Sequence, residues 1–342
     1  MASLSTPKGP VLITGGAGYI GSHAVQLLIE QGVETVVFDD LSAGHREAVR
    51  GEFVEGDLAD KGAIADAIQR YKPVAAMHFA GKCYVGESVT EPGLYYQANV
   101  VNSLNLLREL QRAGVRDVVF SSTCATYGQP EVVPIPDDAP LGPMTPYGQT
   151  KLDVENILAS FKRAYGMRHA CLRYFNAAGA SPDGSLGEVH IPETHLIPLV
   201  LEVALGQRDE LKIFGLDYPT PDGTCVRDYI HVCDLAQAHL NAIALLQSGV
   251  ESLTCNLGTG QGFSVLEIVE TAREVTGHPI PVTVAEPREG DPAFLVSGGT
   301  LAESVLGWTP QRADLRTIIE DAWRFKRAHP DGYSGSSTET KP

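Results

Sequence analysis

The chain has 342 residues, of which 43% are hydrophobic and 20% charged, which is enough for one large globular domain or two ordinary ones. Its formal net charge of −16 argues against a nucleic-acid partner or an anionic membrane surface, although a local group of arginines can still form an anion site. No apolar run approaches the ~20 residues of a membrane span. The start, MASLSTPKGP, lacks the apolar core of a secretory signal, so a cytoplasmic protein without membrane attachment is expected.

Cysteine and histidine spacing gives no sign of a metal site. The six cysteines are scattered without a C-x-x-C pair, which favours reduced thiols. The ten histidines show no H-E-x-x-H or comparable ligand spacing, so we predict no structural or catalytic metal.

The first half of the chain alternates short apolar runs with helical patterns. Strands are predicted at 11–15, 35–40, 53–57, 74–81, 117–123 and 169–175, and helices at 22–32, near 61–70, within 93–113 and over about 147–165. Continuous apolar strands that alternate with helices are typical of a parallel sheet covered on both faces.

After Asn176 the alternation stops and loops become longer. Helices are predicted at 196–206, 234–249, 264–276 and 314–328, and strands at 211–215 and 253–258, the last of which can rejoin the first sheet. We therefore expect an α/β protein with a doubly wound, nucleotide-binding domain over residues 1–178, to which the chain returns around 229–260. A smaller α/β domain takes mainly residues 179–342, with a polar tail from about 333 that frays.

A glycine-rich loop, ITGGAGYIGSH, follows the first strand and opens the first helix. Gly15, Gly18 and Gly21 permit a tight turn, a close approach to a pyrophosphate, and close packing of the helix on the strand. Asp39 ends the next strand, where a carboxylate accepts hydrogen bonds from ribose hydroxyls and repels the extra phosphate of NADP, so NAD is predicted. Asp57, at the end of the third strand, is a weaker candidate for the adenine edge.

The stretch TPYGQTK places Tyr147 and Lys151 one helical turn apart. A tyrosine with a pKa near ~10 is a poor base at neutral pH, but a neighbouring ammonium and a positive nicotinamide favour the phenolate and lower that pKa. Thr123 ends the strand 117–123 and can position a substrate alcohol. These three groups together predict proton removal from an alcohol as a hydride leaves for NAD.

These motifs resemble the extended short-chain dehydrogenase/reductase family, and the likeness to its UDP-sugar 4-epimerases extends over nearly the whole chain. The stretches that carry it are GGAGYIGSH, FAG…VGESV, FSSTCATYG, PYGQTK, RYFNAAGA, IFGLDYPTPDGTCVRDYIHV and REGD. The resemblance implies a Rossmann-type fold, a retained NAD and a homodimer. It also implies interconversion of UDP-galactose and UDP-glucose, with Tyr147 taking the proton of the sugar 4-hydroxyl, Thr123 assisting, and Lys151 supporting the tyrosine and holding the nicotinamide ribose.

The resemblance also implies two sets of binding residues. The expected cofactor contacts are Gly15, Gly18, Tyr19, Ile20, Gly21, Asp39, Asp57, Leu58, Phe79, Ala80, Asn99, Tyr147, Lys151 and Tyr174. The expected substrate contacts are Thr123, Asn176, His195, Leu196, Phe214, Tyr218, Arg227, Arg288, Asp291 and Leu295.

Several of these substrate residues have specific expected roles. Arg227 and Arg288 would neutralise the diphosphate, because arginine forks match phosphate oxygens, although a surface ion pair is the commoner role of one arginine alone. Phe214 and Tyr218 would frame the uracil, and Asp291 would contact the ribose or the phosphate loop.

The sequence departs from the family pattern at a few positions. Cys83 stands where some relatives have a lysine, so the neighbouring Lys82 is either a cofactor contact or a solvent-facing lysine. His195 either bonds the diphosphate or caps the following helix. Leu295, at the position that decides whether an N-acetyl group fits, is intermediate in size.

Alternative functions remain open from the sequence. Cys124 and Ala125 follow Thr123 where dehydratases carry an acid/base pair, which excludes that reaction, and Cys124 is interpreted as a packing residue. UDP-N-acetylglucosamine and UDP-N-acetylgalactosamine, UDP-glucuronate or a UDP-pentose remain possible substrates. A non-catalytic NAD-binding regulator is disfavoured because it has no need of Tyr147, Lys151 and Thr123 together.

Overall fold

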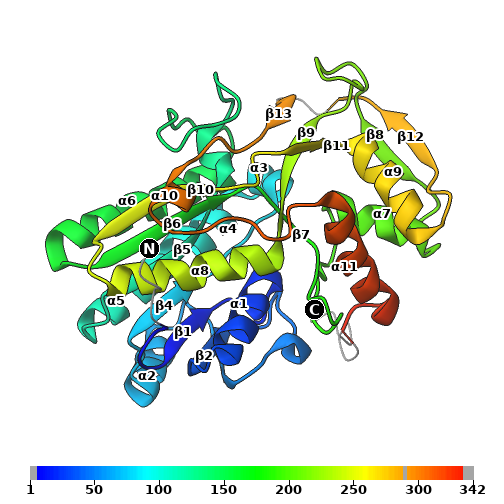
Figure 1. Cartoon of the computed structure of the whole chain (residues 1–342). Coiled ribbons are helices and arrows are strands. Elements are labelled where there is room, and N and C mark those ends of the chain that lie inside the picture. The colour runs from blue at the N-terminus through cyan, green and yellow to red at the C-terminus, as the bar shows by residue number, and fades with distance from the viewer. Residues whose placement is uncertain (1–5, 288–290, 334–342) are drawn as a thin grey trace.

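A seven-stranded parallel sheet forms the larger part of the molecule in the computed structural model, which describes residues 6–287 and 291–333 (Figure 1). The spatial order is β3-β2-β1-β4-β5-β6-β10. The strands are β1 (Val11–Thr14), β2 (Thr35–Asp39), β3 (Glu52–Glu55), β4 (Ala75–His78), β5 (Asp117–Thr123), β6 (Arg168–Tyr174) and β10 (Ser252–Leu257). The chain builds outward from β1 first toward β3 and then toward β10, so the direction of winding reverses between β1 and β4. The expected α/β class and the expected return of strand 253–258 to this sheet are confirmed.

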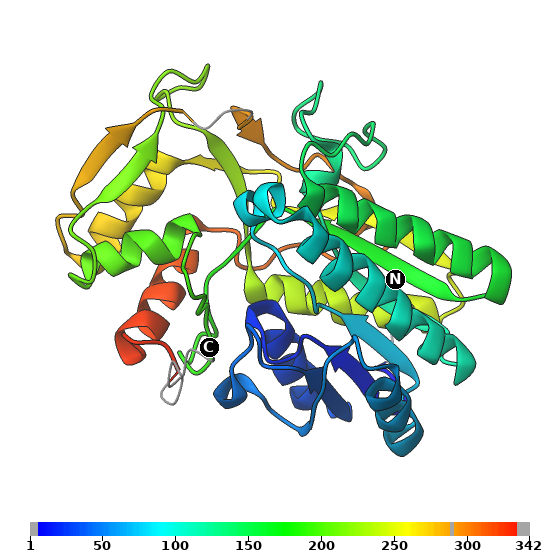
Figure 2. The ribbon, with the colours of Figure 1, turned by 180° about the vertical axis from the view of Figure 1, so that it is seen from behind.

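Alternate residues of the strands face two separate apolar layers. Val11 and Ile13 pack on one side of the sheet with helices α1 (Tyr19–Glu30) and α8 (Val232–Gln247). Leu12 packs on the other side with α2 (Lys61–Tyr71), α5 (Asn102–Arg112) and α6 (Pro146–Tyr165). Side chains of a strand alternate between faces, so a strand buried on both faces has to be apolar throughout. Figure 2 shows α5 and α6 side by side over the second face.

The helix predicted within 93–113 is a continuous run of three segments, in which a π-helical segment lies between two α-helical ones. It consists of α4 (Pro92–Tyr95), the π-helical segment η2 (Tyr96–Val101) and α5, and it follows the short helix α3 (Val85–Thr90), which the sequence analysis did not predict. A π-segment is often found at functional sites because it changes which side chains face inward. Here it carries Asn99, whose side chain is buried.

The smaller part of the molecule has its own core and two small sheets. Strand β9 (Val226–His231) is central to a four-stranded sheet with β7 (Asn176–Ala178), β11 (Gly262–Ser264) and β13 (Phe294–Leu295), and β8 (Leu211–Phe214) pairs with β12 (Val282–Ala285). The helices α7 (Leu196–Ala204), α9 (Val265–Thr276) and α11 (Leu315–Ala328) pack around them. The remaining short elements are α10 (Leu301–Ser304), η1 (Arg46–Ala48) and η3 (Cys124–Tyr127).

Strand β9 is the main element that the sequence analysis missed. Its sequence VRDYIH contains charged residues, yet Asp228 is completely buried. The Asp228 carboxylate accepts hydrogen bonds from the backbone N–H groups of Thr259, Gly260 and Ser297 at 2.9–3.1 Å. These three donors come from segments distant in the sequence. Because a charged residue is buried in this way, the strand lacks the continuous apolar sequence by which a buried strand is predicted.

The chain end expected to fray from about 333 is fixed at its first residue. Tyr333 is buried, and its hydroxyl accepts a hydrogen bond from the Gly187 N–H at 3.1 Å and donates one to the Gly187 carbonyl at 3.2 Å. The remaining residues of that expectation, 334–342, lie outside the described residues.

A buried ion pair fastens α6 to the sheet. Glu155, on α6, pairs with Arg173 of β6 through two hydrogen bonds of 2.9 and 2.5 Å, and it also accepts one from the Ser122 hydroxyl of β5 at 2.5 Å. Both charged side chains are less than one-tenth exposed. Removing one partner of such a pair leaves a buried charge unpaired, which is strongly destabilising.

We expect Glu155→Ala to lower the free energy of unfolding by about 3–5 kcal/mol, measured by urea denaturation, because it leaves Arg173 buried without its partner. Glu251→Ala is the matched control, since Glu251 pairs with Lys162 at 3.3 Å but is mostly exposed. Its loss should cost no more than ~1 kcal/mol. Equal losses in the two variants would contradict the anchoring role of Glu155.

Candidate active site

The expected site residues gather where the carboxyl ends of β1, β4, β5 and β6 meet. In an open parallel sheet, ligands bind outside these ends at the point where the winding reverses. The Phe79 and Ala80 N–H groups, just after β4, both donate to the Thr14 carbonyl at the end of β1, at 2.9 and 3.0 Å. Thr123 ends β5 and Tyr174 ends β6 beside it. The structure therefore brings together, at one edge of the sheet, segments that are up to about half the chain apart.

The glycine loop has the backbone geometry of a phosphate-binding turn. Gly15 has a φ of +74°, and a Cβ there would lie 2.4 Å from the Ala80 nitrogen. A Cβ at Gly21 would lie 2.2 Å from the Gly15 carbonyl oxygen, so α1 can approach β1 this closely only without a side chain. Helix α1 begins after Gly18 and has no acidic residue in its first turn. Its N-terminal N–H groups thus keep the partial positive charge that favours an anion.

The first two residues of α1, Tyr19 and Ile20, make contacts outside the helix. The Tyr19 hydroxyl donates to the Gly179 carbonyl at 2.7 Å, and Ile20 packs on the core. Tyr19 thereby connects the glycine loop to the segment that follows β7.

Asp39 lies at the end of β2 with its carboxylate turned to the glycine loop. Its oxygens accept the N–H groups of Ala17 and Leu41, both at 2.9 Å, and burial raises the pKa of the carboxyl. Each carboxylate oxygen has two acceptor positions, so one on each remains for a ribose diol. Asp57 is exposed and accepts the Ala59 N–H at 2.8 Å, whereas Leu58 is buried.

The three expected catalytic groups converge from β5 and α6. The Tyr147 hydroxyl lies within hydrogen-bonding reach of Thr123, whose hydroxyl also accepts the Ala125 N–H at 3.1 Å. Lys151 is buried, its ammonium donates to the Ser121 carbonyl at 2.8 Å, and burial lowers its pKa to about 8. Helix α6 begins just before Tyr147, because Thr145 caps its N-terminus and Pro146 occupies its first position.

The expectation that Lys151 would lower the pKa of Tyr147 is wrong for the chain's own groups. Burial raises the pKa of Tyr147 well above its ordinary value, and the neighbouring Cys83 and Tyr174 add to the rise. The nearby Thr123 hydroxyl opposes this only in part. An apolar enclosure disfavours the phenolate, so its formation needs positive charge brought into the same pocket.

Tyr174 belongs to the same enclosure. Its hydroxyl is hydrogen-bonded to that of Ser121, the residue whose carbonyl accepts Lys151. Burial raises the pKa of Tyr174, so it stays neutral. The Phe79 ring lies 4.6 Å from that of His239, and the His239 ring lies 6.2 Å from that of Tyr174.

Asn99 contacts the chain itself with both ends of its side chain. Its oxygen accepts the Lys82 N–H at 2.8 Å, and its nitrogen donates to the Lys82 carbonyl and the Thr150 hydroxyl, both at 3.1 Å. Asn99 therefore holds the segment Gly81–Lys82 against α6 beside Lys151. The Lys82 ammonium lies 3.9 Å from Glu87 and is partly exposed, which matches the solvent-facing interpretation.

On the smaller part of the molecule, Arg227 and Asp291 pair with each other. The Arg227 guanidinium donates to the Asp291 carboxylate at 2.5 Å. Burial raises the pKa of Cys124, and the charge of Arg227 opposes this rise in part, which places the guanidinium near Thr123. Leu295 is the register partner of Arg227 across β13 and β9. Asn176 begins β7, next to β9, and Arg288 lies outside the described residues.

The expected uracil residues lie on β8 and in the turn after it. Phe214 ends β8, and the Tyr218 ring covers Gly215, where a Cβ would lie 2.8 Å from the ring. The Tyr218 hydroxyl is buried without a hydrogen-bond partner among the described residues, so it is available to a ligand. Cys124 packs against the core, and burial raises its pKa to about 12, in keeping with a packing role.

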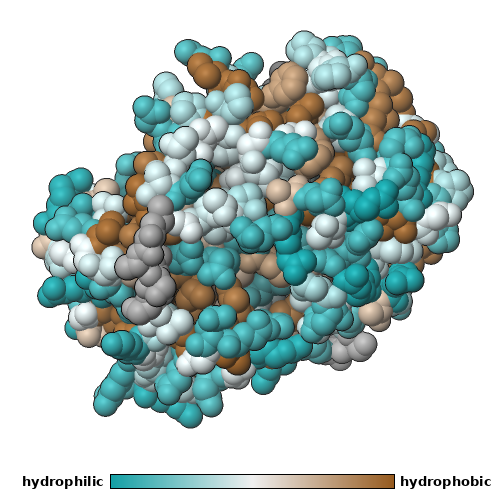
Figure 3. All heavy atoms as spheres, viewed as in Figure 1, coloured by the Kyte–Doolittle hydropathy of each residue, from teal (hydrophilic) through white to brown (hydrophobic). Residues whose placement is uncertain are grey.

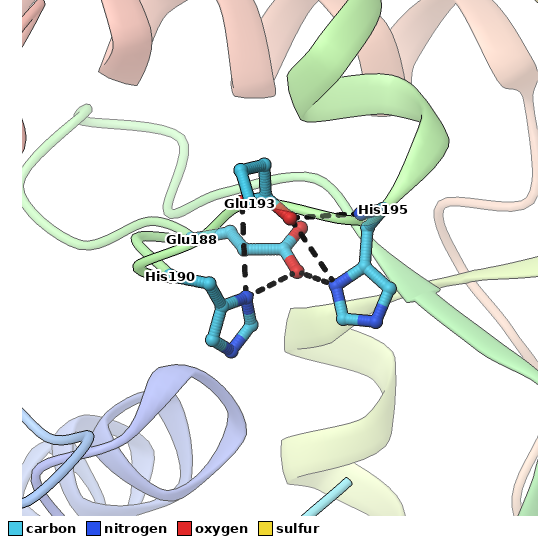
Figure 4. A group of neighbouring side chains, drawn as sticks. All are labelled: Glu188, His190, Glu193 and His195. Atoms are coloured by element: carbon cyan, nitrogen blue, oxygen red, sulfur yellow. Dashed lines mark hydrogen bonds and ion pairs between the residues drawn. The ribbon is translucent and has the colours of Figure 1, made fainter. Parts of the chain in front are cut away.

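The side chain of His195 does not cap α7. It occupies the N-cap position, but its side chain makes no capping hydrogen bond, and its Nδ1 lies 2.6 Å from the Glu188 carboxylate. Figure 4 shows it grouped with Glu188, His190 and Glu193, three residues that the sequence analysis missed. Their spacing, E-x-H-x-x-E-x-H, was the available signal. Leu196 follows as the first residue of α7.

With this geometry established, comparison with known proteins decides the family. Residues 11–258 match the family model described as the NAD dependent epimerase/dehydratase family. The chain belongs to this family. It is 48% identical over 332 residues to a UDP-glucose 4-epimerase of Halalkalibacterium halodurans, covering 97% of this chain and 98% of that protein.

Solved structures agree with this assignment. The structure of UDP-glucose 4-epimerase from Brucella ovis in complex with NAD has a TM-score of 0.91 and 48% identity, covering 93% of this chain and 98% of its own. That of the Stenotrophomonas maltophila UDP-glucose 4-epimerase, with NAD and formylated UDP-arabinopyranose, has a TM-score of 0.91 and 40% identity, covering 94% and 99%. Over the described part of this chain, no helix has the length and apolar character needed to cross a membrane.

We expect Gly21→Ala to reduce the NAD retained by the purified protein at least tenfold, on the order of the 1–3 kcal/mol that overpacking costs. The added methyl group would meet the Gly15 carbonyl and force the loop away from α1. The measurement is NAD released per chain on denaturation. Gly142→Ala is the control, because a Cβ there meets open space. Equal NAD content in both variants would contradict the loop's role.

Proposed function

We propose that the protein is an NAD-dependent UDP-glucose 4-epimerase that interconverts UDP-galactose and UDP-glucose. The observation that carries the proposal is the meeting of Tyr147 and Thr123, within hydrogen-bonding reach, beside Lys151 and next to the glycine loop. The full-length likeness to UDP-glucose 4-epimerases supports the same reaction. The six cysteines are all free, in keeping with a cytoplasmic location.

The residues of the crevice fit NAD. The side-chain-free approach of Gly15 and Gly21, the uncovered N-terminus of α1 and the remaining acceptor positions of Asp39 match a pyrophosphate followed by a ribose. Tyr19, Leu58, Phe79, Ala80 and Tyr174 complete the proposed wall. When bound, NAD supplies the chemistry of hydride acceptance from carbon 4 of the sugar and hydride return.

The proton steps belong to Tyr147. Its phenolate oxygen takes the proton of the sugar 4-hydroxyl, and Thr123 hydrogen-bonds the same hydroxyl and orients it. The phenol then returns this proton to the 4-keto oxygen after the sugar has turned over in its pocket. Lys151 brings positive charge toward the phenolate and donates to the nicotinamide ribose. No net oxidation results, because the hydride removed from one face of the sugar is returned to the other.

The nucleotide part of the substrate lies on the smaller domain. Arg227 neutralises the diphosphate by exchanging Asp291 for phosphate oxygens, and Asp291 then contacts the ribose or the phosphate loop. Phe214 and the unpartnered hydroxyl of Tyr218 frame the uracil. Asn176, His195 and Leu196 line the diphosphate side. Asn99 acts by holding the Gly81–Lys82 segment.

The sugar itself leaves a second candidate function. Leu295 lies opposite Arg227 in the register of β13 and β9, and its intermediate size is compatible with N-acetylated UDP-sugars. UDP-glucuronate and UDP-pentoses need the same catalytic groups. The non-catalytic regulator remains the alternative of another class.

We expect Tyr147→Phe to lose at least 10²-fold in turnover of UDP-galactose while keeping its NAD, because phenylalanine fills the same space without an acid/base group. Proton NMR of purified protein with UDP-galactose follows formation of UDP-glucose, and a second tube with UDP-N-acetylgalactosamine tests Leu295. Cys124→Ala is the control and should keep its activity. A wild type that turns over no UDP-sugar would favour the regulator.

We also propose a homodimer formed through α3, α4 and η2. Five exposed apolar side chains lie on these consecutive elements: Val85, Val89, Leu94, Tyr96 and Val101. Hydrophobic residues in the view of Figure 3 are instead spread among hydrophilic ones, and these elements lie on the opposite side, seen in Figure 2. A second copy supplies the same apolar surface, as a two-fold interface requires, whereas an apolar patch of this kind is costly on a monomer.

The dimer predicts that the wild type elutes with twice the chain mass of 36.6 kDa in light-scattering measurements. Val89→Asp should give the monomer mass, because its carboxylate would be buried against its symmetry mate. Val284→Asp, equally exposed but on the strand β12, should leave the mass unchanged. A monomeric wild type, or a dimeric Val89→Asp, would refute this interface.

A further inference from the structure

Four side chains of one loop form a compact charged cluster between β7 and α7. Glu188, His190, Glu193 and His195 present one ligand-type atom each within 4.8 Å of one another. In Figure 4 the Nδ1 edges of both imidazole rings face the carboxylates, and the opposite edge of the His195 ring faces away from them. The proposed function assigns a role only to His195.

The separations in the cluster favour protons over a metal ion. The Nδ1 atoms of His195 and His190 lie 2.6 and 3.1 Å from the same Glu188 oxygen. Two ligands of one tetrahedral metal, bound at 2.0–2.1 Å, lie about 3.3 Å apart, so the His195–Glu188 contact is that of a hydrogen bond. Glu193 lies 3.7 Å from the His195 nitrogen and 3.8 Å from the His190 nitrogen, close enough to balance charge.

The carboxylates of the cluster are buried, whereas His195 is partly exposed to solvent. The carboxylate side chains of Glu188 and Glu193 are 7% and 6% exposed, whereas the His195 side chain is 46% exposed. Two nearly buried carboxylates are costly unless they are paired with positive charge. With both histidines protonated, the cluster is neutral and turns an imidazolium outward.

The cluster lies beside the anion-binding end of α1. Burial raises the pKa of Tyr19, the first residue of that helix, and the charges of Glu188 and Glu193 add to the rise. On the other side, the Tyr84 ring lies edge-on to His190 at 6.0 Å. Unbalanced carboxylates here would repel both the dinucleotide and a nucleotide diphosphate.

We propose that Glu188 is a positioning residue for substrate binding, which holds His195 as an imidazolium whose Nε2–H donates to the diphosphate of the nucleotide sugar. His190 and Glu193 complete the charge balance of the same cluster. This inference rests on the proposed function, because it assigns the proton state of a residue in that substrate site.

The carboxylates and histidines of the cluster shift one another's pKa values. Glu188 raises the pKa of His195, and the two carboxylates raise that of His190 to about 10, while the two histidines lower that of Glu188 to about 2. The groups that face the cluster from neighbouring elements are Tyr19 of α1, His45 whose Nε2 lies 3.1 Å from the Val189 carbonyl, Cys83 and Tyr84 before α3, and Lys326 of α11.

The sign of the pH dependence follows from these directions. A histidine with a raised pKa carries its charge below that pKa and loses it as the pH rises through it. The contribution of His195 to substrate affinity should therefore persist to a higher pH in the wild type than in a variant without Glu188. Without Glu188, the titration of His195 should return toward ~6.5, and affinity should fall within the neutral range.

The experiment compares pH profiles of kcat/KM for UDP-galactose in holoenzyme variants. We expect Glu188→Gln to lose up to about 25-fold in kcat/KM between pH 6 and 8, mainly through KM, since the charged fraction of an imidazole with a pKa near ~6.5 falls by about that factor over this range. The wild type should fall less over the same range, because Glu188 keeps His195 charged to a higher pH. His195→Asn, which keeps a donor that does not titrate, should show no such fall in either background.

Glu270→Gln is the matched control. It removes a carboxylate of α9 that pairs with Arg273, outside the cluster, so its profile should coincide with that of the wild type. Coincident profiles of Glu188→Gln and the wild type would overturn the proposal. So would a stoichiometric metal retained by the purified protein, if its removal by a chelator gave the Glu188→Gln profile.

A readout independent of activity separates this proposal from the proposed function. Histidine ring NMR, with the His195 signals assigned by their loss in His195→Asn, should show His195 titrating above 6.5 in the wild type and near 6.5 in Glu188→Gln. Titration of His195 at or below 6.5 in the wild type would overturn the proposal. If this result held while no UDP-sugar reacted, the proposed function would fail, and the substrate role of His195 with it.

Discussion

The geometry of the site depends on how α6 is attached to the sheet. Tyr147 and Lys151 come from this one helix, whereas Thr123 comes from β5, and the base must lie within hydrogen-bonding distance of its partner hydroxyl. Glu155, one turn after Lys151, binds Arg173 of β6 and Ser122, the neighbour of Thr123. Because the pair is buried, α6 cannot slide along the sheet without separating two charges in a medium where their attraction is strong. One ion pair thus helps to fix the position of Tyr147 relative to Thr123.

Net charge sets a second constraint. A chain of charge −16 that binds anionic ligands needs local sources of positive charge. The crevice has three: the α1 N-terminus without acidic residues, Arg227, and the outward-facing ring of His195. Carboxylates close to the crevice are compensated, Asp39 by two backbone N–H groups and Asp291 by Arg227. The net negative charge of the chain therefore does not make its ligand site negative.

Burial explains why the Tyr147 phenol is neutral in the chain alone. The pocket that excludes water from Tyr147 also raises the pKa of its phenol and lowers that of Lys151 to about 8. Both effects disfavour the charged forms of isolated groups. The same low polarity strengthens any charge that arrives, so proton removal becomes favourable when positive charge and the substrate hydroxyl occupy the pocket together.

The sequence by itself determined the larger sheet, the glycine loop and the Tyr147–Lys151 pair. Apolar strands buried on both faces, helical periodicity and turn glycines are local signals, and β5 lies within the same bounds as expected, 117–123. The family resemblance then assigned the crevice residues to two ligands. Only the tertiary structure decided the strand β9, because its buried Asp228 is satisfied by donors from distant loops.

The tertiary structure also decided the direction of the Tyr147 pKa, the side-chain partners of Asn99 and the cluster around His195. The E-x-H-x-x-E-x-H spacing is visible in the sequence, but whether four side chains turn toward one another depends on how their loop packs. Periodicity reports which residues are buried. Which charge faces which is fixed by contacts between segments far apart in the chain, and no local pattern contains them.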